Sequence, residues 1–243
     1  KEVYGPLNII HFDAHLDTWA PDKYPSSWHS DQLELNHGSM LWKAHKEGLT
    51  THHNVHAGLR TKLLGVEDWE DDDDQHFTRI DADDIWLKGA PWVVQKILET
   101  VPNNTATYIS VDIDVLDPGF GLGTGTQEPG GWLPRELIYV LRHIDSLKIV
   151  GADIVEVAPA FDNAEITSTN GAQVVFELFT SMVKGGPLHS LVADANPSEI
   201  VKVEKGNVES EIKKKLDEVE NLKAKFMKDL EEVRKENAVN EVN

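Results

Sequence analysis

Short apolar runs alternate with longer stretches of helical periodicity along most of this chain. The runs, rich in β-branched residues, predict strands at residues 7–10, 54–59, 107–111 and 149–157. Apolar residues that recur every three or four positions predict helices at 40–48, 92–101, 135–144 and about 172–183. Strands that alternate with helices predict an α/β fold with a mainly parallel sheet covered on both faces.

Local signals refine this pattern. Ser39 precedes the helix at 40–48 and is predicted to be its N-cap. Pro91 and Pro134 stand where the next two helices should begin, because proline is favoured in the first helical turn. The acidic run at 70–74 is predicted to be a solvated loop.

The composition changes after about residue 191, so we divide the chain into a main domain, 1–191, and a charged tail, 192–243. Residues 208–239 are dense in Lys and Glu. Their apolar positions, which are Ile212, Leu216, Val219, Leu222, Phe226, Leu230 and Val233, recur at threes and fours. This predicts a C-terminal amphipathic helix or a short coiled coil, although the step from Val219 to Leu222 breaks a strict heptad.

Composition narrows the classes of function. Of the 243 residues, 40% are hydrophobic and 27% charged, which is typical of a soluble globular protein. A net charge of -19 argues against nucleic acid and anionic membranes as partners and favours cations. The absence of cysteine excludes disulfides and thiolate metal sites. No apolar run reaches transmembrane length and no signal-peptide pattern opens the chain. These observations assign no cellular compartment.

Acidic residues follow two of the predicted strands. Asp112 and Asp114 would point to the same side of an extended chain, as would Asp13, His15 and Asp17. Neighbouring carboxylates repel each other, so a multivalent cation between them would explain both clusters. The alternative for Asp112 and Asp114 alone is a capping or turn role.

These five residues form an oxygen-rich set with one imidazole, which suits Mn²⁺ or a similar octahedral divalent ion. Several carboxylates for so few ligands suggest two ions that share bridging aspartates. Paired ions typically activate water and stabilise the oxyanion of a hydrolytic transition state. Ligands of parallel sheets bind beyond the carboxyl ends of the strands, where both clusters fall.

Four segments resemble the ureohydrolases, the family of arginase and agmatinase: FDAHLD at 12–17, SVDIDVLDP at 110–118, GTGT at 123–126 and DIVEV at 153–157. The resemblance extends over about residues 3–188. It implies a three-layer α/β/α sandwich. It also implies a dimanganese hydrolase of guanidinium compounds, in which a hydroxide that bridges the two ions attacks the substrate and urea is released.

The resemblance also implies a role for each matching residue. Asp13 and Asp112 would bridge both ions, Asp17 would hold one of them, and His15 and Asp114 would hold the other. Asp17 would in addition hydrogen-bond the hydroxide.

Three further residues match substrate-handling positions of the family. Glu156 would pair with the guanidinium group, His37 would shuttle a proton, and Thr126 would present a hydroxyl to the substrate. A hydrogen bond at a helix start is the alternative for His37, and a core ion pair is the alternative for Glu156. His11, His52, His53 and His56 are expected to be structural or surface histidines.

Two departures from the family pattern refine the prediction. Trp19 stands where arginases carry an asparagine that reads the substrate carboxylate, which favours agmatinase and places Trp19 near the substrate. The upstream Gly-Gly-Asp-His segment, which supplies a histidine ligand, is absent, as if the N-terminal third were missing. We therefore expect one tight and one weak Mn²⁺ site, and His11 is the first candidate for a replacement ligand if both bind equally.

The sequence as a whole predicts an agmatinase-like enzyme that converts agmatine to putrescine and urea, and we expect a homo-oligomer. One alternative is a ureohydrolase for another guanidine compound, such as 4-guanidinobutyrate. Another is a catalytically impaired relative that acts as an assembly protein through its C-terminal helix.

Overall fold

One parallel sheet organises the chain, for which a computed structural model describes residues 2–23, 35–63 and 65–186. The sheet has five strands in the order β3-β2-β1-β4-β5, and every neighbouring pair is parallel. The strands are β1 (Asn8–Phe12), β2 (Asn54–Leu59), β3 (Phe77–Asp81), β4 (Ala106–Asp112) and β5 (Lys148–Val155). Because all five run the same way, their carboxyl ends meet at one edge of the sheet.

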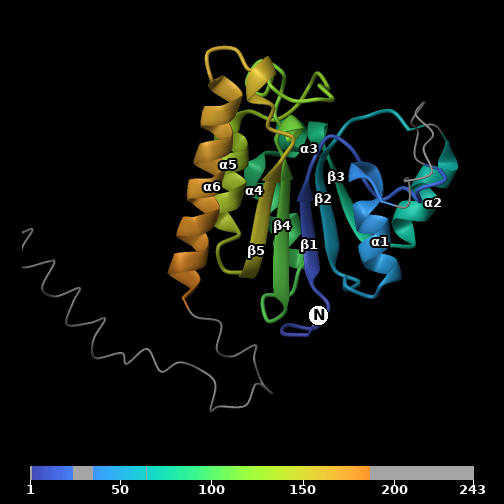
Figure 1. The fold of residues 1–243 in the computed structure, drawn as a ribbon. Helices are drawn as coiled ribbons and strands as arrows, with labels where there is room; N and C mark the ends of the chain where they lie inside the picture. Colours follow the sequence, from blue (N-terminus) through green and yellow to red (C-terminus); the bar gives the residue numbers. More distant parts are fainter. Residues whose placement is uncertain (1, 24–34, 64, 187–243) are drawn as a thin grey trace, which may run out of the picture. The chain divides into compact units, whose positions relative to one another are not determined.

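Helices cover both faces of this sheet (Figure 1). They are α1 (Met40–Lys46), α2 (Val66–Asp73), α3 (Ala82–Lys88), α4 (Ala90–Thr100), α5 (Pro134–His143) and α6 (Ile166–Gly185). Short 3₁₀ turns lie at His37–Ser39, Ile113–Val115 and Pro159–Phe161. Helices α3 to α6 pack on one face, and α1 and α2 lie on the other. The expected three-layer α/β/α arrangement is confirmed.

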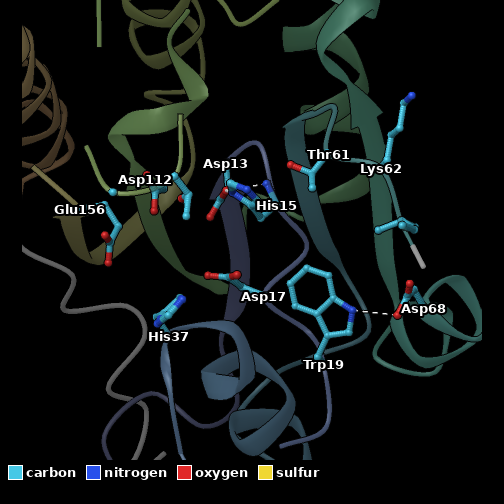
Figure 2. A pocket seen from close by; sticks show the side chains of 13 residues that line it. Asp13, His15, Asp17, Trp19, His37, Thr61, Lys62, Asp68, Asp112 and Glu156 are labelled. Atoms are coloured by element: carbon cyan, nitrogen blue, oxygen red, sulfur yellow. Dashed lines mark hydrogen bonds and ion pairs between the residues drawn. The ribbon is translucent and has the colours of Figure 1, made fainter. Parts of the chain in front are cut away.

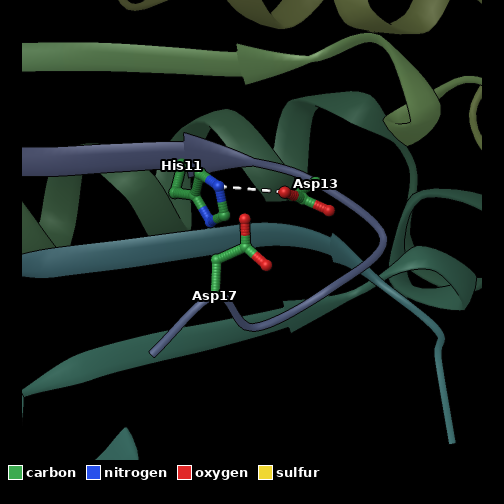
Figure 3. A group of neighbouring side chains, drawn as sticks. All are labelled: His11, Asp13 and Asp17. Atoms are coloured by element: carbon green, nitrogen blue, oxygen red, sulfur yellow. Dashed lines mark ion pairs between the residues drawn. The ribbon is translucent and has the colours of Figure 1, made fainter. Parts of the chain in front are cut away.

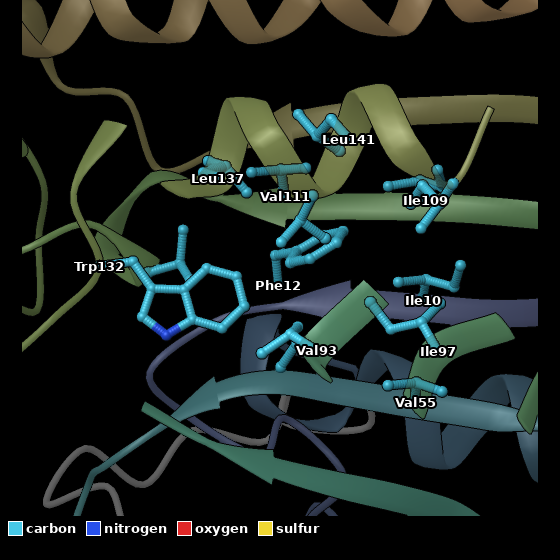
Figure 4. Packing of buried hydrophobic residues seen from close by; sticks show 14 of the residues in the cluster. Ile10, Phe12, Val55, Val93, Ile97, Ile109, Val111, Trp132, Leu137 and Leu141 are labelled. Carbon is cyan, nitrogen blue, oxygen red and sulfur yellow. The ribbon is translucent and has the colours of Figure 1, made fainter. Parts of the chain in front are cut away.

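The face under α3 to α6 is apolar. Ile10 and Phe12 of β1 point into a continuous cluster that also contains Ile109 and Val111 of β4 (Figure 4). Phe12 meets the ring of Trp132 edge-on, with 6.1 Å between the ring centroids. This core anchors the strands whose ends carry the candidate site.

The opposite face, which we call the polar face, alternates with the apolar one along the same strands. His11 of β1 and His56 of β2 lie directly opposite each other in the sheet register, and both are buried. Ile9, Leu41 and Phe77 form a small apolar cluster, and the ring of Phe77 stacks on that of His56 with 3.9 Å between the centroids. No helix in the described ranges has the length and apolar character to span a membrane.

Most of the predicted elements exist, with differences at their ends. Helix α6 begins at Ile166, six positions before the predicted start, and β3 and α3 were not predicted. Ser39 is the residue before α1, but its hydroxyl makes no capping bond to that helix. Instead, the hydroxyl oxygen accepts a hydrogen bond from the backbone N–H of Asn36. The prediction for 208–239 and for the tail boundary concerns residues outside the described ranges.

The prediction of a loop at 70–74 is wrong, and the predicted exposure to solvent holds for only part of this run. Residues 70–73 belong to α2, and the side chain of Asp72 is fully buried, although Glu70, Asp73 and Asp74 are exposed. Burial of Asp72 is possible because three groups compensate its charge: the hydroxyl of Thr18, the imidazole of His56 and the guanidinium of Arg79.

Candidate metal centre and substrate cavity

Asp13 is the central residue of the candidate site. It directly follows β1, and its side chain is almost fully buried. One carboxylate oxygen, Oδ1, accepts the backbone N–H of His15 at 2.6 Å and lies 3.1 Å from His15 Nδ1. The other, Oδ2, lies 3.0 Å from Nε2 of His11. Both oxygens of Asp13 are therefore held in fixed directions.

The end of β4 supplies the second pair of carboxylates through a turn. The strand stops at Asp112, whose side chain accepts the backbone N–H of Asp114 at 2.8 Å and caps the 3₁₀ turn that follows. Asp114 Oδ1 then accepts the N–H of Ala14, and Oδ2 lies 3.0 Å from His15 Nδ1. The spacing predicted that both side chains lie on an extended strand, but the strand ends at Asp112 and Asp114 lies in the turn that follows. The capping role considered as the alternative is present, because Asp112 caps this turn.

Asp17 likewise reaches the site through a turn. Its backbone has a positive φ of 54°, in the left-handed region that non-glycine residues seldom adopt. Glu156, one residue past β5, has a φ of 61°. Such conformations cost about 1 kcal/mol or more and cluster at functional sites. Both strained residues point toward the same cavity.

A cavity of about 350 Å³ lies over these strand ends (Figure 2). Its walls are formed by Asp13, His15, Asp17, Trp19, His37, Thr61, Lys62, Leu63, Asp68, Asp112, Gly125, Thr126 and Glu156. Glu156 and Trp19 lie on opposite sides of the aspartates, and His37 lies between Glu156 and Asp17 in the view of Figure 2. Every predicted site residue except Asp114 lines this space.

The substrate-handling candidates take clear positions. Glu156 is exposed at the cavity wall, which disagrees with the alternative of a core ion pair. Trp19 is buried and its indole N–H donates to Asp68 Oδ1 at 2.8 Å. Thr126 Oγ1 donates to Asp114 Oδ2 at 3.2 Å, so this hydroxyl contacts a predicted metal ligand.

Arg60 joins the loops around the site. Its guanidinium donates to the backbone carbonyls of Gly58, Asp114, Val115, Leu116 and Glu128, at 2.5 to 3.4 Å. Gly58 is required here because it has a φ of +108°, and a Cβ would lie 2.5 Å from Val115 Cγ2. The ends of β2 and β4 are therefore held together by one side chain and one close backbone approach.

Burial and the repulsion between neighbouring carboxylates shift the pKa values of the site residues. Burial raises the pKa of Asp112 to about 10, and the charges of Asp13 and Asp114 add to this shift. Burial and the charge of Asp13 also raise the pKa of Asp17 to about 7. Burial acts to lower the pKa of His15, but its hydrogen bonds to Asp114 and Asp13 outweigh burial and raise it to about 11. The site thus stabilises positive charge among its carboxylates.

Two groups of side chains could each hold a metal ion. One consists of His11, Asp13 and Asp17 (Figure 3), and the other of Asp13, His15 and Asp114; within each group the ligand atoms lie within 4.8 Å of one another. Asp13 belongs to both, as a bridging ligand would. Oxygen donors with imidazole fit Mn²⁺ and similar ions. Asp112 lines the same cavity but belongs to neither group.

The structure adds Lys62 and Asp68, which the sequence did not indicate, to the cavity wall. His11, expected to be structural and named only as the first candidate for a replacement ligand, is in direct contact with Asp13. A signal for His11 existed, because it lies two residues before Asp13 and therefore on the same side of β1. Nothing in the sequence indicated Lys62 or Asp68, since both depend on the position of α2 and the loop before it.

Known proteins similar to this chain agree on one family. The model of the Arginase family matches residues 1–180. Putative agmatinase 3 of Schizosaccharomyces pombe is 46% identical over 205 residues, which are 84% of this chain and 48% of that protein.

Two solved structures are also similar. A hypothetical agmatinase from Burkholderia thailandensis has 36% identity and a TM-score of 0.61, over 73% of this chain and 50% of that one. Proclavaminate amidino hydrolase from Streptomyces clavuligerus has 33% identity and a TM-score of 0.66, over 76% and 58%.

This chain thus spans about half the length of the curated relatives that it matches. The match nevertheless includes all the strand ends described above, and it extends over most of the described residues. The resemblance found in the motifs is confirmed: the chain belongs to the arginase family.

Proposed function

We propose that this chain carries the catalytic centre of a metal-dependent hydrolase of guanidinium compounds, with agmatine as the substrate and putrescine and urea as the products. The main support is the position of Asp13. Two candidate ligand groups share this residue, and it lines a cavity whose wall also carries the exposed carboxylate of Glu156. The names of the similar proteins, agmatinase and amidino hydrolase, point to the same substrate class.

Two Mn²⁺ ions held by Asp13, His15, Asp17, Asp112 and Asp114 would supply Lewis-acid chemistry that lowers the pKa of water. The chain's other residues bind and orient the substrate. Glu156 accepts two N–H groups of the planar guanidinium, a bidentate contact that fixes the orientation of the central carbon.

The reaction then needs two proton transfers from the water to the alkyl nitrogen. The water oxygen bonds to the guanidinium carbon and the bond from that carbon to the alkyl nitrogen breaks. Both water protons end on that nitrogen, so the amine leaves as an ammonium group and the urea is neutral. His37 lies at the cavity wall and can carry one of these protons, because an imidazole ring can both accept and donate a proton. Asp17 accepts a hydrogen bond from the attacking water.

The charges of the cavity favour a cationic substrate tail. Asp68 and Glu156 lie at its walls in addition to the proposed metal ligands, and agmatine carries a positive charge at each end. The position of Lys62 at the cavity wall favours a second candidate substrate, 4-guanidinobutyrate. The ammonium group of Lys62 would pair with the carboxylate of this compound.

A urea-release assay of the Mn²⁺-loaded chain with agmatine, arginine and 4-guanidinobutyrate tests these proposals. We expect the highest kcat/KM for agmatine. A preference for arginine would overturn the assignment of agmatine, and no urea from any of the three would overturn the activity. Lys62→Ala should lower kcat/KM for 4-guanidinobutyrate alone, and Glu156→Gln should lower it for all three while Mn²⁺ still binds.

A further inference from the structure

A line of buried polar side chains leads from the candidate metal centre across the polar face of the sheet. His11 Nε2 lies 3.0 Å from Asp13 Oδ2, and His11 Nδ1 lies 3.0 Å from Nδ1 of His56. His56 Nε2 lies 3.0 Å from Asp72 Oδ1, and Arg79 donates to Asp72 Oδ2 at 2.7 Å. We call His11, His56 and Asp72 the buried line.

Three separate elements build the buried line. His11 and His56 are register partners on β1 and β2, so the sheet places their rings edge-to-face with centroids 5.1 Å apart. Asp72 comes from α2, which covers this face. Its outer partner Arg79 is half-buried, lies over the ring of Trp69 and also pairs with Asp73. The line therefore extends from the cavity floor to the surface.

Stability alone does not explain these residues. Each of the three is at most 2% exposed, and burying charged or polar groups is often no more stabilising than apolar side chains of the same size. The other face of the same strands shows that apolar residues can fill such positions, as Phe12 and Ala57 do. The buried line is therefore a candidate for a role beyond packing.

The order of hydrogen bonds along the line defines the orientation of His11. Arg79 and Thr18 both donate to Asp72, so this carboxylate is ionised and accepts from His56 Nε2–H. One hydrogen lies between the two Nδ1 atoms, and each ring keeps an Nε2–H, which His56 donates to Asp72 and His11 donates to Asp13 Oδ2. The Nε2 atom of His11 is then the one that faces Asp13, as Figure 3 shows.

We propose that the buried line is a positioning device for Asp13, in which Asp72 and His56 lock the ring of His11 and His11 fixes the direction of Asp13 Oδ2. The inference rests on the metal site of the proposed function. Asp13 is the residue shared by both candidate ligand groups, so a small rotation of its carboxylate would disturb both ions. His56 and Asp72 belong to neither group, and partners of this kind, which orient a ligand without touching the metal, typically contribute 10–100-fold to metal affinity.

The test is a calorimetric titration of the full chain with Mn²⁺ for wild type, Asp72→Asn and Arg79→Gln. Asparagine has the shape of aspartate but no charge and only one acceptor oxygen, so it cannot serve His56, Thr18 and Arg79 together and holds the ring of His56 less firmly. We expect Asp72→Asn to weaken Mn²⁺ binding by about 10-fold or more, within the usual range for such partners. Arg79→Gln, at the outer end of the buried line, should weaken Mn²⁺ binding by a smaller factor. This second variant still tests the proposal if Asp72→Asn fails to fold.

Glu177→Gln is the matched control, because Glu177 is also a buried carboxylate paired with an arginine, Arg142, but lies on α6. It should lower the Tm measured in excess EDTA without changing Mn²⁺ affinity. If the buried line only stabilises the fold, Asp72→Asn will behave like Glu177→Gln, and the proposal is overturned. Absence of Mn²⁺ binding in wild type would overturn it too, together with the metal site. Wild type that binds Mn²⁺ without releasing urea would contradict only the proposed reaction.

Discussion

The two faces of the sheet are built from alternate residues of the same strands, yet they have opposite characters. On β1, Phe12 enters an apolar cluster while its neighbour His11 joins a buried hydrogen-bonded line. On β4, Val111 and Ser110 differ in the same way. Parallel sheets are usually apolar on both faces. The difference indicates that one face supports the fold and the other supports the strand ends.

The largest effect should come from removing carboxylates at the end of β4. Asp112→Asn/Asp114→Asn should abolish Mn²⁺ binding, because both are proposed ligands, while the apolar face keeps the chain folded. Elemental analysis after Mn²⁺ loading and gel filtration measures this. The charge-matched variant Glu70→Gln/Asp83→Asn, at exposed positions, should bind as wild type does. Unchanged stoichiometry in the first double variant would remove the basis for the metal centre.

A truncation on the apolar face should affect stability. Phe12→Ala should lower the free energy of unfolding by about 3–5 kcal/mol, because the large cavity left beside Trp132 cannot close fully. Urea denaturation followed by circular dichroism gives this value. Phe176→Ala on α6, where the ring is mostly exposed, is the aromatic control and should change it by less than about 0.5 kcal/mol. Equal effects of both variants would contradict the described core.

The pH dependence of stability sharpens the contrast at the polar face. The raised pKa values of Asp17, about 7, and Asp112, about 10, mean that the folded chain keeps protons that the unfolded chain releases above pH 4. Stability without metal should therefore fall as pH rises from 5 to 8, and the raised pKa of His15 acts in the same direction above pH 6.5.

Mn²⁺ should reverse part of this fall, because the ion replaces those protons as the compensating charge. The measurement is the Tm at pH 5 and pH 8, in EDTA and in Mn²⁺. The gain in Tm from Mn²⁺ should be larger at pH 8. A metal-free Tm that rises between these two pH values would show that the carboxylates do not hold protons as described.

The smallest effect concerns a hydroxyl at the far end of the polar face. Tyr108 donates to Asp153 Oδ2 at 2.9 Å, and Ser110 donates to Oδ1 of the same carboxylate. Tyr108→Phe should cost about 0.5–1.5 kcal/mol in the free energy of unfolding, because Asp153 keeps one donor. Mn²⁺ affinity should stay unchanged, since this contact is separate from the buried line. A weakened affinity would mean that the whole polar face, and not one line, supports the site.

The sequence predicted the parts of this molecule that depend on local pattern. Strands β1, β4 and β5 are apolar runs, and acidic residues after parallel strands must meet at one edge. Helix α2 was missed because its sequence, VEDWEDDD, buries only Asp68 and Asp72 and shows no apolar stripe. An acidic run of this kind is most often solvated.

The buried line could not be predicted, because its members are 45 and 16 residues apart in the chain. Only the register of β1 against β2 brings His11 to His56, and register is a property of the assembled sheet. The routes of Asp17 and Asp114 into the site were also missed, since both depend on turns that follow the strands. Metal ligation by the five predicted residues stays a prediction.

The hydrogen bonds from Arg60 to five backbone carbonyls affect how these segments open locally. The segments after β2 and β4 and the one around Glu128 share this single donor, so none can leave its place without breaking bonds to the others. Such segments behave as one cooperative unit in hydrogen exchange. The amides of Thr61, Asp114 and Gly131 should then exchange with a common free energy of opening, even though they lie far apart along the chain.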